Sequence, residues 1–245
     1  MTNDTLLYDI GLVDYQTVWD YQLKLFDQIV GMKQDKLRAS TVHTTPNVLI
    51  WVSHPHVYTL GKSGDATNML VSEDFLKSKG ATLVAVDRGG DITYHGPGQL
   101  VGYPIIDLDN FGLDIKGYIH KLEAVIIALV ASYGIVASRD AKAIGVWIDQ
   151  GKQTQRKICA IGVRCSRHVT MHGFALNMNT DLAFFDFINP CGFTDKGATS
   201  LAKELGRKID ENEVKVRITK LFAQEFGMNI VQKEFTAFDK IIVRG

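Results

Sequence analysis

The sequence predicts an α+β fold in which a few helices pack on a mixed or mostly antiparallel β-sheet. Segments with helical periodicity alternate with strand-like segments, and several of the strands follow one another as hairpins. Apolar residues make up 46% of the chain and charged residues 22%, close to the globular average. Because no repeat, low-complexity tract or Pro/Gly-rich linker divides the 245 residues, we expect a single domain over residues 1–245.

The first half of the chain is expected to form two helices and five strands. Apolar residues that recur every three or four positions predict a helix over Tyr15–Lys33. A short helix over Glu73–Lys79 is expected to follow Ser72 as its N-cap and to end at Gly80. Strands are expected at Leu6–Asp14, Asn47–Val52, Val57–Leu60, Ala81–Val86 and Gln99–Leu108.

The second half is expected to form two further helices around a set of hairpins. A helix over Ile115–Tyr133 is predicted to stop at Gly134, and a helix over Glu211–Phe226 is predicted to stop at Gly227. A long loop is expected over Asn179–Ala198. Strands are expected at Ile144–Asp149, Lys157–Val163, Val169–Met178 and Met228–Gln232.

Charge and cysteine content exclude several classes of protein. Lys and Arg number 27 and Asp and Glu number 27, so a partner such as nucleic acid or an anionic membrane is not expected. The longest apolar run, Ala124–Ala131, is far shorter than the ~20 residues of a membrane-spanning helix. The first residues lack the apolar core of a signal peptide, and the three cysteines form no CxxC pair. We therefore expect a cytoplasmic protein.

The segment Arg88–Gln99 is the most unusual part of the sequence. It places four glycines and a proline between two expected strands, more than one turn requires. Glycine lets the backbone approach a ligand closely and leaves its N–H groups unobstructed. A two-turn connection would also explain the glycines, but Arg88, Tyr94 and His95 within the segment favour a binding site.

Other motifs do not complete a phosphate or metal site. Gly61-Lys62-Ser63 resembles the end of a phosphate-binding loop, but position 56, where the pattern requires glycine, is His56. His168 and His172 are four residues apart, yet their segment reads as a strand and no acidic third ligand lies nearby. We therefore expect no metal.

Cys191 and Lys157 are the candidate reactive side chains. Pro190 and Gly192 hold Cys191 on a stiff turn with open backbone amides, an arrangement that can lower a thiol pKa and stabilise an oxyanion. Lys157 begins an apolar strand, and strand alternation places it on one face with Cys159, Ile161 and Val163. A partly desolvated lysine there can serve as a base. The alternative is a lysine that extends to water from the strand end.

A basic stretch lies between Arg139 and Thr170. It contains seven basic residues against two acidic ones, Asp140 and Asp149. The stretch is either a solvated hairpin edge or a docking surface for an acidic partner. The pattern by itself favours the solvated hairpin edge.

Four blocks of the sequence together resemble the lipoyl(octanoyl) transferase family. They are Arg88–Gln99 followed by Tyr103–Pro104, Lys157–Gly162, His172–Asn177 and Asn189–Gly192. The similarity extends from about Leu12 to Thr199. It implies a mixed-sheet domain of the biotin/lipoate protein ligase type. It also implies transfer of an octanoyl or lipoyl group from acyl carrier protein to a lysine of lipoate-dependent enzyme domains.

The resemblance implies roles by position. Cys191 matches the family's acyl-thioester nucleophile and Lys157 the lysine that activates it, whereas Cys159 and Cys165 match no catalytic position. A thioester donor is already activated, so no cofactor is implied. The substrate-binding positions are Arg88, Gly89, Gly90, Asp91, Ile92, Thr93, Tyr94, His95, Ala160, Ile161, Gly162, Gly173, Phe174 and Ala175.

The implied partners are octanoyl-acyl carrier protein as donor and small lipoyl-bearing domains as acceptors. The acceptors would be lipoyl domains of 2-oxoacid dehydrogenases and the glycine cleavage H protein. An ATP-dependent lipoate or biotin protein ligase of the same fold is the first alternative, and such an enzyme does not need Cys191. A non-catalytic module that binds acyl groups or carrier protein is the second.

Overall fold

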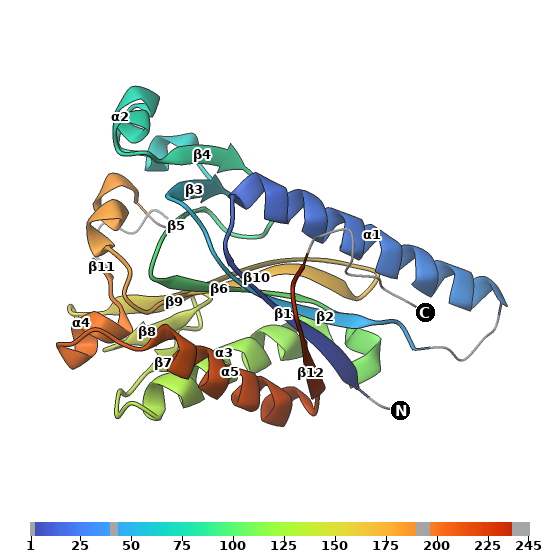
Figure 1. Cartoon of the computed structure of the whole chain (residues 1–245). Helices are drawn as coiled ribbons and strands as arrows, with labels where there is room; N and C mark the ends of the chain where they lie inside the picture. The colour runs from blue at the N-terminus through green and yellow to red at the C-terminus, as the bar shows by residue number, and fades with distance from the viewer. Residues whose placement is uncertain (1–2, 40–43, 190–196, 237–245) are drawn as a thin grey trace.

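A mixed nine-stranded sheet forms the centre of the computed structural model, which describes residues 3–39, 44–189 and 197–236 (Figure 1). The strand order is β12-β1-β2-β6-β10-β9-β8-β7, with β11 paired to β9. The β12-β1-β2 pairs and β11-β9 are parallel, and the other pairs are antiparallel. The strands are β1 (Asp4–Leu12), β2 (Asn47–Ser53), β6 (Gln99–Ile105), β7 (Ser138–Arg139), β8 (Val146–Ile148), β9 (Arg156–Ser166), β10 (Val169–Asn177), β11 (Gly197–Ala198) and β12 (Asn229–Lys233). The predicted mixed sheet is confirmed.

Helices cover both faces of this sheet (Figure 1). The helix α1 (Tyr15–Ala39) lies on one face, and α3 (Ile115–Ala131) and α5 (Glu211–Phe226) lie together on the other. The shorter helical segments are η1 (Ala66–Asn68), α2 (Glu73–Ser78), η2 (Leu108–Phe111), η3 (Leu182–Phe187) and α4 (Leu201–Leu205). None of the helices in the described ranges is long and apolar enough to cross a bilayer.

Each face of the sheet buries its own apolar core. Beneath α3 and α5, Trp51 and Phe174 from the sheet pack edge-on or stacked against Phe222 of α5. Beneath α1, the fully buried Ile29 packs in one cluster with Ile50 of β2. The sheet is therefore covered on both sides, which explains why β2 and β6 are near-continuous apolar runs.

A second, three-stranded sheet stands at one end of the molecule, beside α2 (Figure 1). Its strands are β3 (Val57–Leu60), β4 (Thr82–Ala85) and β5 (Ile92–His95), in the order β4-β3-β5. The rings of Tyr58, Tyr94 and Phe184 form its core. This small sheet carries the glycine-rich segment toward the edge of the main sheet.

Several predicted helix ends are confirmed. The Ser72 hydroxyl accepts a hydrogen bond from the backbone N–H of Phe75 at 3.3 Å, the expected N-cap of α2. Gly227 ends α5 in the left-handed conformation at φ 65°. Gly134 also has a positive φ, but α3 ends at Ala131, two residues earlier than predicted.

The prediction for residues 88–99 was wrong in one respect, because this segment is not a continuous loop. Ile92–His95 forms β5, whose residues pair with β3 in antiparallel register. The glycines lie on both sides of this short strand and leave four residues free to pair.

The prediction of a loop over Asn179–Ala198 was also wrong. The loop contains η3 and ends in β11. The short helix α4 was not predicted, although Ser200 caps it by accepting a hydrogen bond from the Lys203 N–H. The helix α1 runs six residues past the predicted Lys33, through Ala39. The residues Gln34–Ala39 contain neither glycine nor proline, so helix propensity extends it where the apolar pattern has ended.

Candidate active site

The glycine-rich segment is fixed between two other parts of the chain. The loop that follows β3 donates from the N–H of Lys62 to the Arg88 carbonyl at 3.0 Å and from the N–H of Ser63 to the Gly90 carbonyl at 3.2 Å. On the other side, the Gly89 N–H donates to the Val163 carbonyl of β9 at 2.9 Å. The residues 61–63, which form no phosphate loop, therefore hold the glycine-rich segment against the main sheet.

Gly162 of β9 makes this close approach possible, and Gly173 of β10 allows a similarly close approach to β6. A Cβ on Gly162 would lie 2.9 Å from the Gly89 carbonyl oxygen, and a Cβ on Gly173 would lie 2.2 Å from the Gly102 carbonyl oxygen. Gly162 and Gly173 are paired directly across the β9–β10 ladder. The glycines thus serve backbone packing at the edge of the cavity described next.

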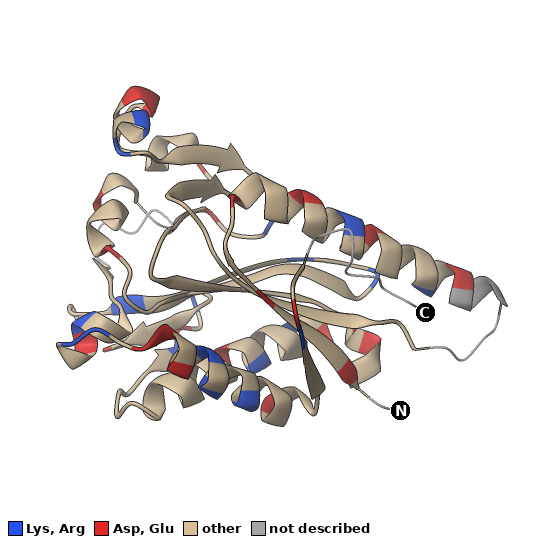
Figure 2. Cartoon of the chain, viewed as in Figure 1, with Lys and Arg blue, Asp and Glu red and all other residues tan. Residues whose placement is uncertain are grey.

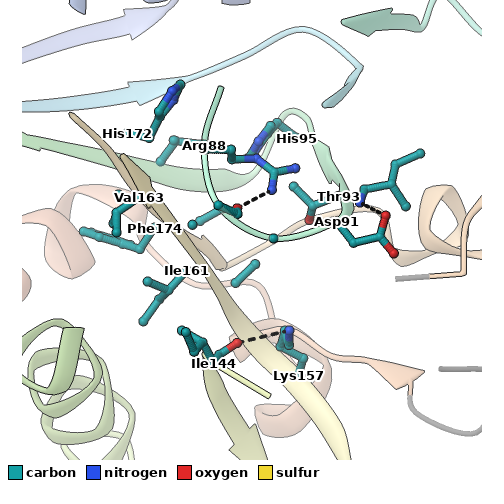
Figure 3. Close-up of a pocket in the computed structure, with 18 of the residues that line it drawn as sticks. Arg88, Asp91, Thr93, His95, Ile144, Lys157, Ile161, Val163, His172 and Phe174 are labelled. Atoms are coloured by element: carbon teal, nitrogen blue, oxygen red, sulfur yellow. Dashed lines mark hydrogen bonds between the residues drawn. The ribbon is translucent and has the colours of Figure 1, made fainter. Parts of the chain in front are cut away.

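A cavity of ≈490 Å³ lies where the glycine-rich segment meets β9 and β10 (Figure 3). This volume is in the range of sites that take small molecules, about 300–1,000 Å³. Every predicted substrate-binding residue except Tyr94 lines it, and so does Lys157. Three stretches far apart in the sequence, 88–95, 157–163 and 172–175, therefore meet at one cavity.

Tyr94 faces away from the cavity because strand β5 alternates. Its ring stacks on Phe184 with centroids 5.0 Å apart, and its hydroxyl bonds the Nδ1 of His56 at 2.7 Å. The residues on either side, Thr93 and His95, line the cavity. The sequence predicts a loop over this segment. Because a loop has no strand alternation, the opposite orientations of Tyr94 and its two neighbours were not predicted.

One end of the cavity is polar, and Figure 3 shows Arg88, His95 and His172 there, with Lys157 at the other end. Arg88 Nη2 donates to the carbonyl and hydroxyl oxygens of Thr59 at 2.6 and 2.9 Å. The amide of Gln99 donates through Nε2 to Asn177, so its oxygen accepts from Nδ1 of His95 at 2.9 Å. Nε2 of His95 then accepts from the Thr59 hydroxyl at 3.4 Å. This network requires a neutral His95.

The charge state of His95 agrees with that network. Burial, with the neighbouring His54 and the Arg88 guanidinium, lowers the pKa of His95 to about 3. His54 is also buried, and desolvation lowers its pKa to about 4. Its Nδ1 donates to the Val13 carbonyl at 2.7 Å, so its Nε2 accepts from the hydroxyl of Tyr103, which lines the cavity. Both histidines are neutral at pH 7.

His172 closes the same end through a pair with Asp87. It adopts a positive φ of 58°, and its Nε2 lies 2.8 Å from the Asp87 carboxylate, which also accepts from Arg164. The hydrogen bond from His172 holds the pKa of Asp87 below its usual range. Burial outweighs the carboxylate and lowers the pKa of His172, so a neutral ring donates to the carboxylate. His168, four residues before it, instead pairs with Asp109, so the two histidines share no ligand.

Lys157 stands at the opposite end, where β9 begins. Its Nζ donates to the Ile144 carbonyl at 3.3 Å (Figure 3). The same Nζ lies 4.5 Å from the ring centroid of Trp147. Val163 lies six positions further along the same strand. At ~3.3 Å per residue, the cavity wall therefore extends roughly 20 Å along β9.

Cys159, Ile161 and Val163 lie on one face as predicted, because they pair with β10 in unbroken register and pack in the core under α3 and α5. The prediction that Lys157 continues this alternation was wrong. Val146 of β8 is opposite Cys159, but Trp147 is opposite Lys157, so β9 carries one extra residue at this point. Such a bulge interrupts the alternation. Cys159 is fully buried in the core under α3 and α5, and burial raises the pKa of its thiol. Burial raises the pKa of Cys165 as well, which fits the expected packing role of both.

Cys191, the predicted nucleophile, lies outside the described residues. The next described residue is Gly197, and β11 pairs Ala198 with Lys157. Gly197 and Ala198 both line the cavity. Ala198 follows Cys191 by seven positions in the sequence.

Several residues of the cavity were missed by sequence reasoning. Gln99, Tyr103 and Asn177 stand inside or beside the quoted motifs, and their polar groups were the available signal. Tyr15 and Trp147 line the cavity from the start of α1 and from β8, and no local pattern marks them. Within the described ranges, no group of three or more His, Cys, Asp or Glu is placed to hold a metal ion.

Most of the basic stretch is paired within the protein. Arg139 pairs with Glu123 at 2.9 Å, and Arg156 pairs with both Asp149 and Glu204. Lys152 and Arg164 pair with Asp149 and Asp87. Figure 2 shows basic and acidic residues interspersed along the helices of the chain. Lys142, by contrast, is exposed and lines the cavity at the end that Lys157 occupies.

Comparison with known proteins gives consistent results. Residues 14–223 match the family described as the lipoyl protein ligase A/B catalytic domain. A protein of Flavobacterium psychrophilum named octanoyltransferase is 52% identical over 232 residues, 94% of this chain and 100% of that protein. An octanoyltransferase of Bacteroides fragilis is 55% identical over 87% of this chain and 94% of its own length.

Solved structures share the fold at low sequence identity. A putative lipoate protein ligase of T. acidophilum with bound lipoic acid superposes with a TM-score of 0.67 at 15% identity, covering 98% of this chain and 92% of that one. Lipoate-protein ligase A bound with ATP gives a TM-score of 0.69, also at 15% identity, with the same coverage of 98% and 92%. The expected ligase-type fold is confirmed.

Proposed function

The chain belongs to the lipoyl protein ligase A/B catalytic-domain family and is an octanoyltransferase, and we propose that it transfers the octanoyl group through a thioester on Cys191. The donor would be octanoyl-acyl carrier protein, and the acceptors would be lysines of lipoyl domains and of the glycine cleavage H protein. A cytoplasmic location, expected from the cysteine content, is part of this proposal.

The observation that carries the proposal is the cavity with a lysine at one end. Aliphatic and aromatic side chains, among them Ile161, Val163 and Phe174, line its middle and fit an acyl chain. Lys157 stands where an acyl carbonyl would enter, and its neighbour Ala198 is seven positions from Cys191 in the sequence. These observations support the proposal of Cys191 as nucleophile, Lys157 as base and the cavity as the site of the acyl chain.

The proposed first half-reaction forms an acyl-enzyme. Lys157, as the neutral amine, takes the proton of the Cys191 thiol, and the thiolate attacks the carbonyl of the carrier thioester. The carbonyl–sulfur bond to the carrier breaks, and the carrier thiolate receives the proton from the Lys157 ammonium. One thioester replaces another, so this step is near energetic balance and needs no ATP.

The proposed second half-reaction forms the amide. The acceptor lysine attacks the Cys191 thioester as a neutral amine and loses a proton to Lys157. The carbon–sulfur bond breaks, and the Cys191 thiolate regains a proton from Lys157. An amide is more stable than a thioester, so this step drives the cycle forward.

The test is mass spectrometry of the intact protein after incubation with octanoyl-acyl carrier protein without ATP. We expect a mass increase of one octanoyl group that hydroxylamine removes and that Cys191→Ser abolishes, together with transfer to a lipoyl domain. Cys165→Ser is the matched control, because Cys165 is half-buried on the same strand as Lys157 and is expected to leave the adduct intact. Full transfer by Cys191→Ser would overturn the covalent mechanism.

The same experiment separates the alternatives. A dependence of transfer on ATP and free acid would indicate a ligase, and binding without turnover would indicate a non-catalytic module. The relatives named octanoyltransferase are 52–55% identical, whereas the ligase structures at 15% identity share the fold alone. The ligase alternative is therefore not favoured.

A further inference from the structure

The side chain of Lys157 is held by the residues Ala143–Trp147, which we call the lysine holder. Its Nζ donates to the Ile144 carbonyl at 3.3 Å (Figure 3) and, on another side, lies 4.5 Å from the ring centroid of Trp147. A Cβ on Gly145 would lie 3.3 Å from Cε of Lys157, so the aliphatic stem rests on the glycine backbone. Carbonyl, ring face and backbone together define one position for the amine.

The ring of Trp147 is itself fixed in the holder. It is 2% exposed, and its Nε1–H donates to the Ala143 carbonyl at 2.8 Å. The turn is anchored to α3, because the Gly145 N–H donates to the Glu123 carboxylate at 3.3 Å. The bulge in β9 sets Trp147 opposite Lys157 in the ladder. Strand register and the hydrogen bond of the indole thus fix the aromatic face at the amine.

We propose that Trp147 is a positioning residue that holds Lys157 and stabilises its ammonium form, an inference that rests on the proposed role of Lys157 as the base. The face of an indole ring attracts a cation within about 6 Å of its centroid. The Ile144 carbonyl accepts from the same ammonium. Both contacts strengthen when Lys157 takes a proton, which is the moment at which the nucleophile loses one. The ring therefore increases the proton affinity of the base.

Other charged groups around Lys157 are the same in the proposed variants. Lys142 of the preceding turn lines the same cavity, and the Cys159 thiol lies on the same strand. Glu123 of α3 is neutralised by Arg139. Ala198 and Thr199, which follow on the other side, carry no charge. As far as the described residues are concerned, a shift in the pKa of Lys157 in the Trp147 variants is therefore attributed to loss of the indole ring.

The test compares the pH dependence of kcat/KM for octanoyl transfer in the wild type, Trp147→Phe and Trp147→Leu. Loss of the ring lowers the pKa of Lys157, so the limb on which the rate rises with pH moves to lower pH. We expect a shift of about 0.5 pH unit for Trp147→Leu, which corresponds to about 0.7 kcal/mol. Trp147→Phe keeps an aromatic face, and we expect a smaller shift in the same direction.

A second readout does not depend on catalysis. Trace acetylation with acetic anhydride across the pH range, followed by peptide mass spectrometry, titrates the Lys157 amine directly and should show the same shifts. Trp51→Phe is the matched control, because Trp51 is equally buried and its indole also donates a hydrogen bond, but it does not line the cavity. We expect Trp51→Phe to leave the limb in place.

Each failure has a distinct signature. An unchanged Lys157 titration in folded Trp147→Leu and Trp147→Phe would overturn the positioning role. Retained transfer in a folded Lys157→Ala variant would instead overturn the role of Lys157 as base, whatever the Trp147 variants show. A shift in the acetylation titration together with inactive Lys157→Ala supports both.

Discussion

At the scale of single residues, the polar end of the cavity depends on histidines that stay neutral. His95 accepts from Thr59 and donates to Gln99, and a second proton on its ring would remove the acceptor. His54 donates to a backbone carbonyl and accepts from Tyr103 in the same way. Protonation would place an uncompensated charge beside the Arg88 guanidinium, which is already buried. The network therefore makes the free energy of unfolding depend on pH.

The sign of that dependence follows from the pKa values. His54 and His95 titrate near 4 and 3 in the folded state, against an ordinary 6.5. The unfolded chain binds more protons below pH 6.5, so their stabilising contribution is complete above that pH and is lost as the pH falls toward the folded values. We expect the free energy of unfolding to fall by roughly 1.5 kcal/mol for each histidine between pH 6.5 and 5.

Urea unfolding at several pH values checks this expectation. His54→Gln should reduce the drop between pH 6.5 and 5 by about the contribution of one histidine. His120→Gln serves as the control, because His120 is exposed on α3 and its loss should leave the drop unchanged. A free energy of unfolding that is constant over this pH interval would contradict the neutral histidine network.

At the scale of elements, the closeness of the glycine-rich segment to β9 depends on Gly162. Alanine there would place its Cβ 2.9 Å from the Gly89 carbonyl oxygen and 3.1 Å from Cδ of Arg88. The backbone must shift, and the hydrogen bond from Gly89 to Val163 must lengthen. We expect Gly162→Ala to lower the free energy of unfolding by about 1–3 kcal/mol, as overpacking does, and to lower kcat/KM for transfer.

The matched control is Gly31→Ala in the middle of α1. A Cβ at Gly31 meets nothing within 4 Å, and alanine is favoured in a helix by roughly 0.5–1 kcal/mol. We therefore expect Gly31→Ala to be slightly more stable than the wild type and equally active. Chemical denaturation and transfer assays on both variants check these two expectations. A fully stable and active Gly162→Ala variant would show that the glycine-rich segment does not pack tightly against β9 at this position.

Prediction at the scale of elements succeeded where one pattern was long and regular. The helices α1, α3 and α5 carry sustained apolar periodicity, and all three are present. It failed for β5, η3 and β11, which are two to six residues long. Segments of that length gain their structure from the strands and rings they pair with, so their own sequence does not mark them.

At the scale of the whole molecule, internal pairing decides the meaning of the basic stretch. Four of its seven basic residues, Arg139, Lys152, Arg156 and Arg164, pair with carboxylates of the same chain. Their charge is largely neutralised within the protein. The exposed Lys142 beside the cavity is therefore the position at which an acidic carrier would respond most strongly to charge.

Charge reversal tests docking at this position. We expect Lys142→Glu to raise KM for octanoyl-acyl carrier protein several-fold at low salt, and added salt to raise the wild-type KM as the attraction is screened. Lys152→Glu changes the net charge equally, but its side chain pairs with Asp149, and a smaller effect is expected. Steady-state kinetics at several salt concentrations check both variants. An equal KM for all three proteins would leave the stretch as a solvated hairpin edge.

The sequence by itself determined the class of fold and marked the three stretches that line the cavity, and it predicts the reactive pair Cys191 and Lys157. The fold class follows from the periodicity of apolar residues, and the site residues follow from four short motifs that carry the family resemblance; both are local properties of the chain. Only the tertiary structure decided that Tyr94 turns away, that a bulge separates Cys159 from Lys157, and that Trp147 meets the amine. Each of these depends on strand register, and register is set by pairing between segments far apart in the sequence.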